Sequence, residues 1–117
     1  MLAAVLRLIS LSSRPAERCQ ANLRFTFTAK GSVGQAFSRD LSLSGAFLKA
    51  DPAPAAGSEL SLRFRLPGDD ADIVCSAIVR RVEHPVDSAP AGFGVEFQGF
   101  RPDDRAKLDR FIRQQLS

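Results

Sequence analysis

The chain has 117 residues, 44% of them hydrophobic and 25% charged, so it fits one globular, water-soluble domain and is too short for two. Cys19 and Cys75 are isolated and His84 is the only histidine, which argues against a disulfide framework and against a metal centre. The net charge of +3 is carried by 13 arginines and three lysines. Because arginine suits bidentate contacts to phosphate, this bias indicates either a phosphate or nucleotide partner or a genome rich in arginine codons.

Residues 1–11 are strongly apolar, but no positive charge precedes the apolar run, Arg7 interrupts it, and it is too short to cross a bilayer. We therefore expect neither a targeting signal nor membrane insertion. The spacing instead predicts a short helix that docks on the body of the protein or on a partner; a start codon placed slightly too early is the alternative. The residues on its apolar face are Leu2, Val5, Leu6 and Ile9. Residues 1–13 thus form an expected N-terminal apolar segment or arm.

The next part of the chain predicts β structure. Apolar and polar residues alternate between positions 21 and 27, which is the period of a strand with one buried face. Two prolines exclude residues 51–57 from a central strand. In all we expect six strands, at residues 21–27, 35–41, 46–50, 60–66, 73–82 and 92–97. Short connections without helices between them favour an all-β fold, a six-stranded antiparallel β-barrel, over an α/β arrangement.

The last segment changes to a helical period. Pro102 suits the first helical position, and Asp103 and Asp104 suit the positive end of the helix dipole. The apolar residues at helical spacing are Leu108, Phe111, Ile112 and Leu116. We therefore expect an amphipathic helix at residues 102–116 that packs on the barrel.

A six-residue turn, Asp40-Leu41-Ser42-Leu43-Ser44-Gly45, joins the second and third expected strands. It places a carboxylate, a hydroxyl and a bare backbone between two apolar stretches, a combination that can bind the edge of a polar ligand. Upstream, Arg14 and Arg18 offer planar guanidinium groups for phosphate and for stacking on flat rings. The alternative is structural: a solvated arginine pair, and a turn held by side-chain-to-backbone hydrogen bonds.

The Arg14-x-x-x-Arg18 pair, the Asp40-x-Ser42-x-x-Gly45 turn and the closing Gly92-Phe93-Gly94-Val95-Glu96-Phe97 strand together resemble the PilZ domain family. The resemblance covers roughly residues 14–116. The family signature is RxxxR followed after one hairpin by (D/N)xSxxG. PilZ domains are small six-stranded β-barrels with a C-terminal helix, so the resemblance implies one such domain over residues 14–117.

Family members that carry both motifs typically bind the bacterial second messenger cyclic di-GMP, so the resemblance implies this ligand and no metal or other cofactor. Arg14 and Arg18 would contact its phosphates and rings, and Asp40 would accept guanine N–H groups, which are donors on one edge of the base. Ser42 would add a hydroxyl contact, while Gly45 would leave room for the backbone or adopt a positive φ. The expected secondary contacts are Arg39, Arg80, Arg81 and Gln98.

The two halves of this motif set lie on different parts of the chain, so a ligand would bridge them. We expect the arm that carries Arg14 and Arg18 to close over cyclic di-GMP, move residues 1–11 and change the surface offered to a protein partner. Motility, biofilm formation and exopolysaccharide production are the expected outputs, in the cytoplasm of a bacterium. The sequence leaves open whether one or two ligands bind, and whether the protein is a monomer or a weak homodimer.

Three other function classes compete with this hypothesis. The first is a PilZ-like adaptor that binds no cyclic di-GMP and acts through protein contacts, for example in type IV pilus assembly. The second is a nucleic-acid-binding barrel, which the absence of Trp and Tyr disfavours because few stacking platforms remain. The third is an enzyme, which we do not expect because one histidine and scattered acids provide no nucleophile–base pair.

Overall fold

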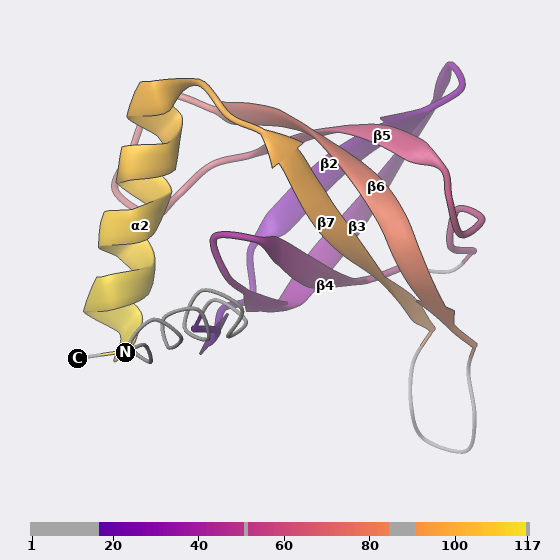
Figure 1. Ribbon diagram of the computed structural model, residues 1–117, viewed down its shortest axis with the longest axis horizontal. Coiled ribbons are helices and arrows are strands. Elements are labelled where there is room, and N and C mark those ends of the chain that lie inside the picture. The colour runs from indigo at the N-terminus through magenta and orange to yellow at the C-terminus, as the bar shows by residue number, and fades with distance from the viewer. Residues whose placement is uncertain (1–16, 51, 85–90, 117) are drawn as a thin grey trace, which may run out of the picture.

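The computed structural model describes residues 17–50, 52–84 and 91–116. Arg14 and the helix expected within residues 1–13 therefore lie outside the described residues. Within them the chain forms seven strands followed by one helix (Figure 1). These elements are β1 (Cys19–Gln20), β2 (Arg24–Ala29), β3 (Ser32–Leu41), β4 (Gly45–Lys49), β5 (Glu59–Phe64), β6 (Ile73–Glu83), β7 (Gly92–Gly99) and α2 (Pro102–Leu116).

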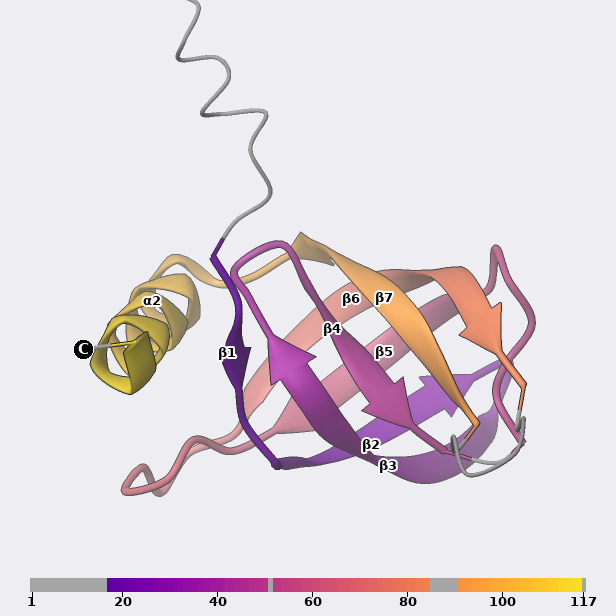
Figure 2. The ribbon, with the colours of Figure 1, turned by 90° about the horizontal axis from the view of Figure 1, so that it is seen from below.

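All strand pairings are antiparallel, and the sheet closes on itself. The order is β1-β3-β2-β5-β6-β7-β4, and β4 pairs with β3 as well as with β7, so six strands form a closed barrel (Figure 2). This confirms the six-stranded antiparallel barrel expected from the sequence. The additional strand β1 pairs with the end of β3, at Asp40 and Leu41. Two residues are too few to display a period of two, so the sequence pattern did not reveal it.

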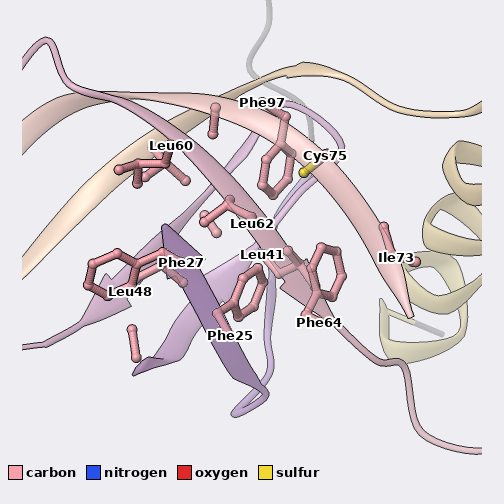
Figure 3. Close-up of a cluster of buried hydrophobic side chains, with 14 of the residues drawn as sticks. Phe25, Phe27, Leu41, Leu48, Leu60, Leu62, Phe64, Ile73, Cys75 and Phe97 are labelled. Carbon is pink, nitrogen blue, oxygen red and sulfur yellow. The ribbon is translucent and has the colours of Figure 1, made fainter. Parts of the chain in front are cut away.

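The barrel interior is filled by side chains that alternate along each strand. On β5, Leu60, Leu62 and Phe64 are buried while the residues between them are exposed. The ring of Phe64 stacks on that of Phe25 with centroids 4.3 Å apart. Figure 3 shows these side chains converging with those of the other strands on one apolar cluster. Burial of these apolar side chains is the main favourable contribution to the fold.

The helix has the expected bounds and packs next to β1 at one side of the barrel (Figures 1 and 2). Leu108 and Ile112 are fully or almost fully buried in the core, whereas Leu116 is 45% exposed, so the apolar face ends before the last turn. Asp104 in the first turn is buried and accepts a hydrogen bond from Arg101 Nε at 3.0 Å. No helix among the described residues is both long and apolar enough to cross a membrane.

The thiol of Cys75 on β6 provides a pH-dependent test of this core. Burial, with a smaller effect from the Asp104 carboxylate, raises the pKa of Cys75 from 9.0 to about 12. The protonated thiol therefore contributes its full stability below pH 9, and this contribution is lost as the pH rises toward 12. We expect urea denaturation to show that, above pH 9, the wild type loses up to about 1.4 kcal/mol of unfolding free energy per pH unit more than Cys75→Ala. Parallel pH profiles for the two proteins would contradict this.

Candidate ligand-binding cleft

A polar cleft of about 460 Å³ lies on the outer face of the barrel, across β3, β4, β7 and β6. The register of these strands forms its central row, because Asp40 pairs with Phe47, Phe47 with Gly94, and Gly94 with Arg81. The lining residues are Arg18, Arg39, Asp40, Ser44, Gly45, Ala46, Phe47, Arg80, Arg81, Gly94, Val95 and Glu96. Segments distant in sequence therefore share one surface only because the sheet closes.

Two β-bulges supply most of the charged lining. In β3 the register shifts between Ser38 and Asp40, so that Arg39 is an extra residue. In β6 it shifts between Val79 and Arg81, so that Arg80 is the extra residue. A bulge breaks the alternation of a strand and aims consecutive side chains toward one face. The Arg39-Asp40 and Arg80-Arg81 pairs consequently both face the cleft, one pair on each side of β4 and β7.

The floor of the cleft is the ring of Phe47, which lies outside the barrel core although it is only 3% exposed. Its neighbours Ala46 and Leu48 point inward, as alternation requires. The guanidinium of Arg39 lies over the Phe47 ring, 3.9 Å from its centroid, and that of Arg81 lies 5.8 Å from it. Such cation–π contacts keep both guanidinium groups near the ring, and the planar guanidinium of arginine can also stack against an aromatic base.

Glycines on β7 make room for this floor. A Cβ at Gly92 would lie 2.5 Å from the Phe47 ring, so the ring rests directly on the Gly92 backbone. A Cβ at Gly94 would meet the Arg81 side chain at 3.9 Å, in the space beside the ring. The side chain between them, Phe93, is fully buried in the barrel. In the Gly-Phe-Gly sequence, Phe93 therefore packs into the core, while Gly92 makes room on the outer face for the Phe47 ring and Gly94 lines the cleft.

The Asp40 carboxylate joins the two halves of the sequence signature. Arg18 Nη1 donates to Asp40 Oδ1 at 2.6 Å, and Arg39 Nε donates to Asp40 Oδ2 at 3.2 Å. Because a carboxylate has about four acceptor positions, Asp40 retains capacity for further donors. Arg18 is held there by β1, in which Cys19 pairs with Leu41 of β3. Burial raises the pKa of the Cys19 thiol, and the Asp40 charge adds to this effect while a backbone hydrogen bond opposes it.

The turn between β3 and β4 is organised by Ser42, which is fully buried. Its Oγ accepts hydrogen bonds from the backbone N–H groups of Ser44 at 3.1 Å and Gly45 at 3.2 Å. The Ser42 N–H in turn donates to the Gly45 carbonyl at 2.8 Å. Ser42 does not line the cleft, and its hydroxyl fixes the shape of the turn that presents Ser44 and Gly45 to it.

Gly45 is required by a close approach of strands rather than by its backbone angles. The positive-φ glycines among the described residues are Gly31, Gly57 and Gly68, so Gly45 has an ordinary φ. A Cβ at Gly45 would lie 2.1 Å from the Val95 carbonyl oxygen of β7. The sequence allowed two reasons for a glycine at position 45, room for the backbone or a positive φ. The structure supports the first of these.

The structure places most of the predicted site residues together. Arg18, Asp40 and Gly45 line the cleft, as do the expected secondary contacts Arg39, Arg80 and Arg81. Gln98 is exposed on β7 and does not line the cleft. Sequence reasoning missed Phe47, Ser44 and Glu96 as lining residues. The signal for Phe47 was present, because alternation with Ala46 and Leu48 directs a large apolar ring to the outer face.

The lining combines four arginines with two carboxylates, those of Asp40 and Glu96. Arg80 Nε donates to Glu96 Oε1 at 2.7 Å, and Arg81 Nε forms an ion pair with Glu83 Oε2 at 3.2 Å. The cleft thus carries excess positive charge, flat guanidinium surfaces and carboxylate acceptors. These groups together suit an anionic ligand with planar rings and N–H donors.

Comparison with protein families gives a match to the PilZ domain over residues 12–114. The chain belongs to the PilZ domain family. The match includes both arginines of the signature and the Asp40–Gly45 turn. Of the signature residues that the structure describes, Arg18, Asp40 and Gly45 line the cleft, and Ser42 fixes the shape of the turn. Comparison with curated proteins gives no match.

Solved PilZ domain structures share the fold. The PilZ domain of YcgR from Escherichia coli, with c-di-GMP, is 18% identical over 88% of this chain and 91% of its own, with a TM-score of 0.69. The Bacillus subtilis inhibitor of motility MotI (DgrA) is 27% identical over 88% of this chain, with a TM-score of 0.74. This chain covers 51% of MotI, and it covers 45% of the Borreliella burgdorferi PlzA protein in complex with c-di-GMP, at 15% identity and a TM-score of 0.66.

Substitution of Gly45 tests the strand contact beneath the cleft. We expect Gly45→Ala to lower the unfolding free energy by about 1–3 kcal/mol or more, because the new methyl group would overlap the Val95 carbonyl and push β4 from β7. Thermal denaturation followed by circular dichroism measures the change. Gly99→Ala on β7 is the matched control, since a Cβ there meets no atom within 4 Å. Equal stability of the two variants would refute the close contact.

Proposed function

We propose that this chain is a bacterial, cytoplasmic receptor for cyclic di-GMP that regulates a partner protein. The contact between Arg18 and Asp40 carries this proposal, because it brings the RxxxR and DxSxxG halves of the PilZ signature into one cleft. YcgR and PlzA, two structures of this fold, contain c-di-GMP. The proposal is for a ligand-binding effector and includes no turnover of the ligand.

The proposed roles follow the chemistry of each group. Cyclic di-GMP has two phosphates and two guanines, and Arg14 and Arg18 would pair with phosphate oxygens and stack on a base. Asp40 would accept the N–H donors of one guanine, using the acceptor capacity that Arg18 and Arg39 leave. Gly45 would allow the ligand to approach the backbone of the turn. Ser42 would act indirectly, because its buried hydroxyl accepts the hydrogen bonds that fix the turn presenting Ser44 and Gly45 to the ligand.

The proposed output is a change of surface near the N-terminus. Arg18 directly precedes β1 and lies at the cleft, so a ligand held there contacts the base of the arm that carries Arg14. Closure of this arm over the ligand would move residues 1–13 and change what a partner can bind. Motility, biofilm formation and exopolysaccharide production are the outputs proposed; MotI, 27% identical, is an inhibitor of motility.

Titration calorimetry with cyclic di-GMP tests the binding site. We expect Arg18→Ala or Arg14→Ala to weaken binding roughly ten- to hundredfold, because each removes a charge-assisted contact of about 1.5–3 kcal/mol. Arg65→Ala is the matched control, because Arg65 is paired with Asp72 away from the cleft. If the folded wild type gives neither heat nor a thermal shift, the proposal is wrong, and an adaptor that acts through protein contacts takes its place.

Amide hydrogen exchange tests the closure of the arm. With saturating cyclic di-GMP, we expect the amides of residues 1–20 to exchange more slowly than without it, because closure orders the segment. Mass spectrometry of peptides from this region measures the effect, and peptides from β5 serve as an internal reference. Unchanged exchange in residues 1–20 of the saturated protein would refute the closure while leaving the binding proposal intact.

A further inference from the structure

Glu96 forms a second acid–arginine pair in the cleft. Arg18 and Asp40 meet at 2.6 Å beside β3, and Arg80 and Glu96 meet at 2.7 Å across β6 and β7. The ring of Phe47 on β4 lies between the two pairs. Glu96 lies in the closing strand of the barrel, outside the RxxxR and (D/N)xSxxG motifs.

The surroundings of Glu96 leave it open to a ligand. It pairs across the sheet with Gly45, which has no side chain to cover it. The Glu96 side chain is 50% exposed, and Arg80 contacts one of its two carboxylate oxygens, Oε1. The contact holds the carboxylate at the cleft and leaves acceptor positions for other donors. Glu96 therefore has the same chemical capacity as Asp40.

The separation of the two carboxylates suits a ligand with two identical ends. Asp40 is on β3 and Glu96 is on β7, two strands away. The residue of β7 in the same row as Asp40 is Gly94, and Glu96 follows it by two residues. With neighbouring strands about 4.8 Å apart and about 3.3 Å per residue, their backbones lie roughly 12 Å from one another. Cyclic di-GMP carries two guanines, and each has a donor edge that requires an acceptor. A single acidic residue would satisfy only one of them.

We propose that Glu96, held by Arg80, accepts the N–H donors of the second guanine and thereby makes the cleft specific for a ligand with two guanines. This inference rests on the proposed function. Adenine has no N1–H and presents a lone pair where guanine presents a donor, so a carboxylate at this position disfavours adenine. Asp40 would bind the first guanine of either ligand, and Glu96 would then distinguish the second base.

The test compares cyclic di-GMP with the mixed cyclic dinucleotide that contains one guanine and one adenine. The single guanine of the mixed ligand can occupy the Asp40 end, so any loss of affinity reports on the other end. For the wild type we expect calorimetry to show about five- to hundredfold weaker binding of the mixed ligand. In Glu96→Gln we expect this preference to fall to less than about threefold, chiefly through weaker binding of cyclic di-GMP.

Glu59→Gln is the matched control. Glu59 lies on β5, two strands from Glu96 in the same row with Ile78 of β6 between them, and does not line the cleft. The Glu59→Gln substitution removes the same charge as Glu96→Gln, so we expect this control variant to retain the wild-type preference for cyclic di-GMP over the mixed ligand. Thermal denaturation of both variants confirms that the fold is kept, since both residues are exposed.

The possible outcomes separate the two proposals. Binding of cyclic di-GMP with no preference over the mixed ligand would overturn the role of Glu96 alone. A preference that survives in Glu96→Gln, or tighter binding of both ligands by this variant, would also overturn it, because Glu96 would then act only as a counter-ion for Arg80. Absence of wild-type binding to either ligand would overturn the proposed function and this inference with it.

Discussion

The pairing of β4 with both β3 and β7 is the constraint on which the structure depends. It closes the sheet, and it also aligns Asp40, Phe47, Gly94 and Arg81 in one row across four strands. The β4–β7 contact is close because Gly45 and Gly92 have no side chains. The backbone hydrogen bonds that close the barrel therefore also assemble the cleft.

Much of the fold could be predicted from the sequence, because one face of each strand is buried and period two is then imposed by the core. Strand β5 and helix α2 are the clearest examples, and α2 has the predicted bounds. Leu116 was assigned to the apolar face of α2 but is exposed, since the helix extends past the surface it packs on. Strand β1 is held by its partner β3, and a pairing of this kind leaves no local pattern.

The motif residues of the cleft could be predicted, but its assembly could not. Arg18, Asp40 and Gly45 were recognised by spacing, whereas the β-bulges that aim Arg39 and Arg80 depend on register between distant segments. The charged doublets Arg39-Asp40 and Arg80-Arg81 do interrupt otherwise alternating strands, which is the local sign that a bulge leaves. Ser42 was expected at the ligand, and the structure adds that its hydroxyl holds two amides of the turn.

The arginines of the cleft already have carboxylate partners: Arg18 and Arg39 contact Asp40, and Arg80 contacts Glu96. An anion that enters the cleft must therefore exchange one partner for another rather than meet bare charges. Such an exchange makes the net electrostatic gain smaller than the number of arginines implies. For the same reason, a phosphate alone would bind these arginines little better than the carboxylates of Asp40 and Glu96 already do. A ligand that also donates hydrogen bonds to those carboxylates recovers the interaction free energy that is lost when the ion pairs are displaced.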